Sequence, residues 1–257
     1  MLAYRAAYPQ RRIILVLTGT DVYRDIRRSR AAVRAMEAAD VLVTLQPEAI
    51  RELPPRLRRK ARAIVQSSPS RPHAPRRRAG TLRICVLGHL RPEKDPMRAA
   101  LAVRSLDPDL RVEVVHAGGI LAAPYERATE REMRRNARYQ YVGELSRARA
   151  LALLRKSDLL VQSSRMEGGA NTVCEAIACG TPVLASRIPG NTGLLGRNYP
   201  GLYEAGNTQA LARLIERTAT SPAFYERLRD ACDMLRPMVE PQRELAAWKA
   251  VMKRTYR

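Results

Sequence analysis

The stretch LLVQSSRMEGGANTVCEA, residues 159–176, decides the fold of this chain. It begins with a short apolar run typical of a buried strand. It then passes through a turn that contains Gly168 and Gly169 and continues into a helical pattern from about Asn171. A strand that leads through a turn into a helix is the repeating unit of a parallel α/β sheet. We therefore expect an α/β fold around this stretch.

Strand and helix patterns alternate along the whole C-terminal part of the chain. Strands buried on both faces appear as continuous apolar runs, and such runs lie at 83–87, 111–116, 139–142, 159–162, 182–185 and 202–203. Helical patterns cover 95–105, 125–136, 146–157 and 171–179. About six strands make a complete Rossmann-like domain, which we assign to residues 81–235.

A shorter series of the same kind comes first. Its expected strands are 13–17, 41–45 and 63–66, with helices at 27–39 and 47–53. Because a Rossmann-like domain usually has about six strands, we expect residues 1–70 to form a truncated N-terminal domain, which either lacks its first strands or begins at an internal methionine. Residues 71–80 form the predicted linker, since 67–80 is rich in Pro, Ser and Arg without an apolar face. Residues 236–257 contain an amphipathic helix that we expect to cross back to the N-terminal domain.

The composition limits the class of protein. The chain has 257 residues and a formal net charge of +21, but its basic residues are spread out, with one dense run at 76–78. Aromatic residues do not alternate with Arg as nucleic-acid stacking platforms require. We therefore expect no nucleic-acid partner and favour polyanionic small molecules such as nucleotide diphosphates. No apolar stretch is long enough to span a membrane, no signal peptide is visible, and the four cysteines show no disulfide or zinc spacing. These features predict a cytoplasmic protein without a metal.

The turn after the strand at 159–162 is the strongest candidate site. Ligands of open α/β sheets bind beyond the carboxyl ends of strands, and unpaired N–H groups at a helix start favour a diphosphate. Glu167 before the helix and Glu175 within it are each able to accept hydrogen bonds from two sugar hydroxyls. The alternative is a helix whose first turn merely carries acidic residues. The other candidate contacts in this turn are Gly168, Gly169, Ala170, Asn171 and Thr172.

Two further loops follow predicted strands. In the loop 88–95, Lys94 is able to reach phosphates as a mobile charge, and Arg91 is a second candidate. His89 there is either a phosphate donor or an ordinary loop histidine.

In the loop 18–25, Asp21 is a candidate base, an orienter of the acceptor or a helix cap. Gly19 and Arg24 are candidate acceptor contacts, although an exposed Arg is the commoner role. His116 ends a strand before a flexible turn, where a structural hydrogen-bond role is at least as expected as a nucleotide contact. The turn 189–193 is a weaker candidate for contact with the donor.

Taken together, these motifs resemble the GT-B glycosyltransferases of family 4. The pattern from Glu167 to Glu175, followed by AIACGTPVLAS, resembles the donor-site signature of that family. The loops 88–94, 143–146 and 18–22 resemble its phosphate-binding loop, its base-contacting turn and its acceptor-side loop. The resemblance implies two Rossmann-like domains facing a cleft. It also implies that Glu167 binds the donor sugar and Glu175 the ribose.

Departures from the family pattern point to a subgroup. His89 replaces a usual Arg, Thr18 replaces a frequent His, and Gly169 replaces a common Phe. The segments LTGTDVYRDI, GHLRPEKDP, SSRMEGGANTVCEA and SRIPGNTGLLG resemble the selenosugar synthases (SenB type) of selenoneine biosynthesis. This resemblance implies transfer from UDP-N-acetylglucosamine or UDP-glucose to selenophosphate without a metal, and Asp21, Lys94 and Glu167 are the catalytic candidates. The alternatives are a family 4 enzyme with a carbohydrate or lipid acceptor and a non-catalytic UDP-sugar-binding remnant.

Overall fold

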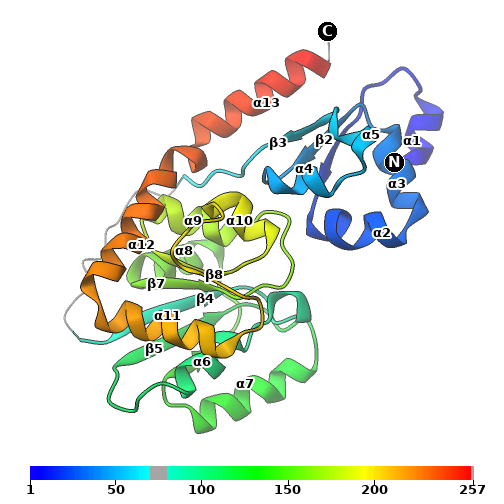
Figure 1. Ribbon diagram of the computed structural model, residues 1–257. Coiled ribbons are helices and arrows are strands. Elements are labelled where there is room, and N and C mark those ends of the chain that lie inside the picture. The colour runs from blue at the N-terminus through cyan, green and yellow to red at the C-terminus, as the bar shows by residue number, and fades with distance from the viewer. Residues whose placement is uncertain (70–79, 256–257) are drawn as a thin grey trace.

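The computed structural model describes residues 1–69 and 80–255, which form two α/β units (Figure 1). The N-terminal unit contains a three-stranded parallel sheet of order β1-β2-β3. Its strands are β1 (Ile14–Leu17), β2 (Val41–Thr44) and β3 (Ala61–Ala63). Around them lie α1 (Leu2–Ala7), the π-helical turn η1 (Asp21–Asp25), α2 (Ile26–Arg28), α3 (Arg30–Ala38), α4 (Glu48–Glu52) and α5 (Pro55–Arg58).

Two boundaries in this unit differ from the prediction. The helix expected at 27–39 is interrupted because Ser29 takes extended dihedrals and its hydroxyl accepts from the N–H of Ala32, so a new helix begins at Arg30. The third strand lies at Ala61–Ala63 rather than 63–66. After Ile64 the chain leaves the sheet, and the backbone N–H of Ser67 donates to Glu244 instead.

The C-terminal unit contains a six-stranded parallel sheet of order β6-β5-β4-β7-β8-β9, as expected for a Rossmann-like domain. Its strands are β4 (Leu82–Leu87), β5 (Val112–Ala117), β6 (Tyr139–Tyr141), β7 (Leu159–Gln162), β8 (Val183–Ser186) and β9 (Leu202–Tyr203). Its helices are η2 (Pro92–Lys94), α6 (Arg98–Arg104), α7 (Pro124–Arg135), α8 (Arg147–Lys156), α9 (Asn171–Cys179), α10 (Pro189–Leu195), α11 (Thr208–Thr220), α12 (Pro222–Leu235), η3 (Arg236–Val239) and α13 (Pro241–Thr255). The prediction of an α/β GT-B-like fold with parallel sheets is thereby confirmed.

The largest hydrophobic core lies between this sheet and its helices. Strands β7 and β8 are buried along their whole length. Helices α6 and α11 pack together on one face of the sheet, and α8 and α9 on the other (Figure 1). Helix α6 begins at Arg98, not at residue 95 as expected, because Asp95 takes a left-handed conformation before Pro96.

The two units touch along loops and helices. A methyl group built on Gly19 of the N-terminal unit would lie 2.6 Å from the backbone nitrogen of Gly168, so only glycine allows this approach. On α4, the Glu48 carboxylate accepts from the hydroxyl of Thr192 at 2.6 Å and from Arg197 Nε at 2.5 Å. Both units therefore contribute to one interface.

Helix α13 packs on the N-terminal sheet, although it follows the C-terminal unit in sequence (Figure 1). Val251 is buried with Val43 and Ile64, and Trp248 packs against this cluster. None of the helices within residues 1–69 and 80–255 combines the length and apolar character that a membrane crossing requires.

Candidate active site

The candidate site lies where the strand order of the C-terminal sheet reverses. Strand β4 pairs with β5 on one side and with β7 on the other, so the loops after β4 and β7 diverge from neighbouring strand ends. Such a switch point opens a crevice in doubly wound sheets. The two loops are joined there, because the N–H of Arg165 donates to the carbonyl of Glu93 and the Ser163 hydroxyl contacts the carbonyls of Lys94 and Asp95.

Lys94 and Glu167 meet at this crevice. Lys94 Nζ lies 2.5 Å from Glu167 Oε1, and the side chains are 21% and 9% exposed. The same carboxylate oxygen accepts from Gln162 Nε2 at 2.8 Å and from Ser164 Oγ at 2.6 Å. A carboxylate oxygen that accepts three hydrogen bonds is held in one orientation. The structure thus brings together two of the three predicted catalytic residues.

Gln162 and Ser164 are site residues that the sequence prediction missed. Gln162 is the one polar residue of β7, whose sequence is LLVQ. Its carbonyl oxygen accepts from the Thr172 hydroxyl at 3.1 Å. The position of a polar residue at the carboxyl end of an otherwise apolar strand was the available signal, because that end of the sheet faces the crevice.

Glu175 lies in a different surrounding from Glu167. It is buried on α9 and accepts from Asn171 Nδ2 at 3.1 Å, while Arg147 Nε lies 3.8 Å away. Burial raises the pKa of Glu175, and Arg147 and Asn171 oppose this effect. The helix N-terminus between the two carboxylates has no side-chain cap at Ala170, so its first N–H groups remain available to an anion.

The predicted phosphate loop is braced by the turn after β5. His89 Nδ1 accepts from the N–H of Gly119 at 3.0 Å, which leaves Nε2 as the protonated nitrogen of a neutral imidazole. Arg91 Nε is buried without a hydrogen-bond partner in the described residues. Both side chains therefore retain a donor for phosphate oxygens.

His116 has a structural role. Its ring is buried, with Nε2 at 3.2 Å from the carbonyl of Gly88 and Nδ1 at 3.0 Å from Tyr139 Oη. Because a carbonyl only accepts, Nε2 must donate and Nδ1 must accept from the tyrosine. Burial lowers the pKa of His116 to about 4. The structural interpretation of this strand-end histidine, one of two that the sequence left open, is the one that this geometry supports.

On the acceptor side, Asp21 lies in the first turn of the helical segment that begins at Gly19. Its Oδ2 accepts from the backbone N–H and the hydroxyl of Thr18, both at 2.7 Å, while the carbonyl of Thr18 accepts from the N–H of Val22. This is a capping contact, one of the three roles that the sequence left open for Asp21, and it orders the 18–21 turn. This turn carries Gly19, which touches Gly168 of the donor-side turn.

The remaining candidate contacts are Arg24, Gly169 and the turn 189–193. Arg24 is exposed and forms an ion pair with Asp25 at 2.9 Å. The hydrogen bond to Asp25 and the charge of that residue raise the pKa of Arg24. Gly169 lies against Leu45, where a methyl group would approach to 2.6 Å. The turn 189–193 is helical and contacts the N-terminal unit, since a methyl group on Gly193 would overlap the side chain of Gln46.

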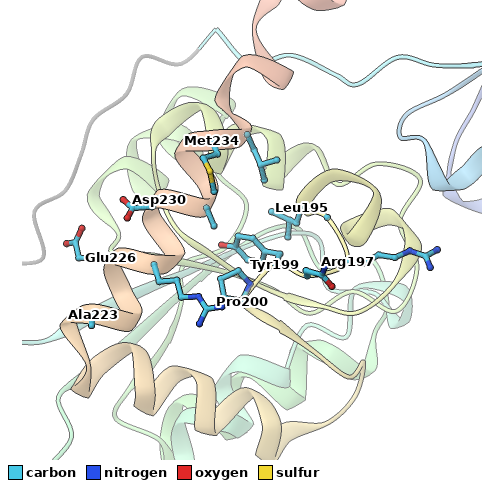
Figure 2. Close-up of a pocket in the computed structure, with 13 residues that line it drawn as sticks. Leu195, Arg197, Tyr199, Pro200, Ala223, Glu226, Asp230 and Met234 are labelled. Atoms are coloured by element: carbon cyan, nitrogen blue, oxygen red, sulfur yellow. The ribbon is translucent and has the colours of Figure 1, made fainter.

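A pocket of about 640 Å³ lies elsewhere, between the segment from Leu195 to Pro200 and helix α12 (Figure 2). Its charged residues on α12, among them Glu226 and Asp230, are exposed to solvent. It shares no residue with the Lys94 and Glu167 cluster. The crevice at the switch point, rather than this pocket, therefore gathers the convergent polar groups of a ligand site.

Residues 72–232 match the family described as Glycosyl transferases group 1. This chain belongs to that family. The prediction of a glycosyltransferase of this class is therefore confirmed at the level of the family. A curated member, Glycosyltransferase 1 domain-containing protein 1 of Xenopus tropicalis, is 26% identical over 155 residues, which are 60% of this chain and 45% of that protein. The chain thus matches less than half the length of this relative.

Two solved structures are similar to this chain over nearly its whole length. Anabaena Alr3699/HepE in complex with UDP-glucose matches with a TM-score of 0.77 and 16% identity, covering 98% of this chain and 74% of that protein. An α,α-trehalose-phosphate synthase (UDP-forming) from Burkholderia xenovorans in complex with glucose-6-phosphate matches with a TM-score of 0.78 and 13% identity, covering 99% and 70%. At these identities the likeness establishes the fold.

Proposed function

We propose that this protein is a glycosyltransferase that transfers a sugar from UDP-N-acetylglucosamine or UDP-glucose to selenophosphate. The observation that carries the proposal is the ion pair between Lys94 and Glu167 at the switch point of the sheet. It places a cation for phosphate and a carboxylate for sugar hydroxyls side by side. The UDP complexes of the structurally similar Anabaena protein support a UDP-sugar as the donor.

The donor is held by groups from three loops. The first turn of α9 offers N–H groups to the diphosphate, and Arg91 and His89 each retain a donor that faces no partner in the described chain. Glu167 accepts from the sugar hydroxyls and Glu175 from the ribose. No metal is required in this proposal, because these cations and dipoles stabilise the charge of the leaving diphosphate.

The acceptor is proposed from the acceptor-side loop and its resemblance to selenosugar synthases. Thr18 stands where many family members have His, so no imidazole base is available at that position. Selenophosphate is already an anion and needs no base to activate it. Exposed Arg24 is the proposed contact for its phosphate group, and Asp21 orders the loop that carries it.

The step is a substitution at the anomeric carbon. A lone pair of selenium forms the carbon–selenium bond, while the bond between that carbon and the β-phosphate oxygen breaks. The electron pair of that bond leaves with UDP, next to Lys94. No proton is transferred in this step, and a Se-glycosyl selenophosphate and UDP are formed.

The test measures UDP release from each UDP-sugar with selenophosphate. We expect Glu167→Ala to lower kcat/KM by about 100-fold or more, because the hydroxyl groups of the donor sugar lose their main hydrogen-bond partner. The matched control is Glu130→Ala, which removes an exposed carboxylate on α7. Full activity of Glu167→Ala would remove its assigned role. Release that depends on a carbohydrate or lipid acceptor instead would point to another acceptor, and binding of UDP-sugar without any turnover would point to a non-catalytic binding protein.

A further inference from the structure

The side chain of Gln162 is hydrogen-bonded to three polar residues of the site. The residue is 4% exposed. Its Nε2 donates to Glu167 Oε1 at 2.8 Å and to Ser164 Oγ at 3.1 Å. Its Oε1 accepts from the Thr172 hydroxyl at 3.1 Å. A buried amide costs free energy unless it is hydrogen-bonded, and here all of the hydrogen bonds found for it are made to the site.

The chemistry of the partners fixes the direction of each hydrogen bond. An ionised carboxylate only accepts, so the amide nitrogen must face Glu167 and the amide oxygen must face Thr172. The Ser164 hydroxyl gives its proton to Glu167 and accepts from Gln162. The network therefore has one arrangement of protons, which makes it rigid.

Glu167 uses only one of its two oxygens in this network. Oε1 accepts from Lys94, Gln162 and Ser164, whereas no protein donor contacts Oε2 in the described part of the chain. We propose that Gln162 is a positioning residue: it holds Oε1 so that Oε2 is presented to the donor sugar. This inference rests on the proposed function.

Glu167 needs the hydrogen bond from Gln162 because Lys94 has two proposed partners. The ammonium group pairs with Glu167 in this structure and is also the proposed contact of the diphosphate. When the diphosphate takes a share of Lys94, Glu167 keeps two neutral donors that no ligand withdraws. Through the Thr172 hydroxyl, the same amide also contacts the first turn of α9, whose backbone N–H groups are positioned by the helix itself.

The experiment compares affinities for UDP and UDP-glucose by calorimetry in the full chain. Gln162→Met keeps the length of the side chain and removes its hydrogen bonds. We expect UDP-glucose to bind about 10-fold more weakly or worse, since a hydrogen bond to a charged group is lost, while UDP affinity changes by less than about 3-fold. The control is Asn136→Leu, because Asn136 is also a buried amide that donates to a buried carboxylate, Glu132, outside the site.

A second variant, Gln162→Glu, supplies a readout that a merely structural role would not move. Two adjacent carboxylates repel each other when ionised, but a protonated Glu at this position is able to donate to Glu167. UDP-glucose affinity of this variant is expected to recover as the pH falls from about 8 to about 5, whereas the wild-type affinity does not rise. This titration decides the matter if Gln162→Met fails to fold.

Each outcome has one meaning. If the wild-type chain binds neither ligand, the proposed function fails and this inference falls with it. The other decisive case is one in which the wild-type chain binds UDP-glucose and the ratio of UDP-glucose affinity to UDP affinity is the same in Gln162→Met as in Asn136→Leu. The proposed function then stands, and the positioning role of Gln162 is overturned. An absence of pH-dependent recovery in Gln162→Glu would also overturn it.

Discussion

The contact between Gly19 and Gly168 makes a quantitative prediction about the interface of the two units. A methyl group on Gly19 would lie 2.6 Å from the Gly168 nitrogen and 3.0 Å from the Glu167 carbonyl carbon. Both are backbone atoms, so no side chain is able to turn away. Restoring ordinary contact requires the two loops to separate by about 0.8 Å. Overpacking of this kind costs about 2 kcal/mol, within a range of about 1–3 kcal/mol.

We expect Gly19→Ala to lower the free energy of unfolding of the N-terminal unit by about this amount. The assay is urea unfolding followed by the fluorescence of Trp248, the single tryptophan, which packs against the N-terminal sheet. Gly88→Ala is the control, because its methyl group would meet nothing closer than 3.9 Å. Its effect is expected to be within about 0.5 kcal/mol.

Gly168→Ala adds a test of the mechanism. Its methyl group would lie 2.4 Å from the Gly19 nitrogen, so it strains the same contact from the other side. Once one methyl group has separated the loops, the second has less to displace. The double variant is therefore expected to lose less stability than the two single losses combined. Additive losses, or single variants indistinguishable from Gly88→Ala, would refute the reasoning.

Three further predictions concern titratable groups and the interface. Burial lowers the pKa of His116 to about 4 from 6.5, so the folded state prefers the neutral ring. The free energy of unfolding is therefore expected to fall by up to about 3 kcal/mol as the pH drops from about 6.5 to about 4. Urea unfolding of His116→Gln across this range should show a smaller fall. Burial raises the pKa of Glu175, so calorimetry should show that the UDP affinity of the wild-type chain decreases as the pH falls through that pKa. Glu175→Gln should bind UDP about 10-fold more weakly at neutral pH, and its affinity should not show this dependence on pH. Thr192→Val should cost about 1.5 kcal/mol in the Trp248 assay, because a buried hydroxyl loses its bond to the Glu48 carboxylate. Arg197→Met should cost at most about 0.5 kcal/mol, since that side chain is 66% exposed, and the reverse ranking would contradict this assignment.

The sequence predicted best the strands and helices whose formation depends on residues close together along the chain. The strand Leu159–Gln162 and the helix Asn171–Cys179 lie at the predicted residues, because apolar periodicity and a glycine after the last turn are local signals. The start of α12 is equally local, because the Ser221 hydroxyl accepts from the N–H of Phe224 three positions later.

The contacts that complete the site and the interface depend on residues far apart in the chain. Lys94 and Glu167 are 73 positions apart, and Glu48 and Arg197 are 149 positions apart. No periodicity connects such pairs. The sequence therefore indicated which loops carry the site, but not that Gln162 joins them or that Glu48 holds the two units together.

The two chain segments that run between the units meet at one place. The N–H of Ser67, on the segment that leaves β3, donates to Glu244 at the start of α13, and the N–H of Ser68 donates to the carbonyl of Val239 just before it. Beyond this junction, α13 is packed on the N-terminal sheet through Val251. Any rotation of one unit relative to the other would therefore carry α13 together with the N-terminal sheet. The body on that side of the junction is built from both ends of the chain, so its boundary lies at two positions in the sequence rather than at one linker.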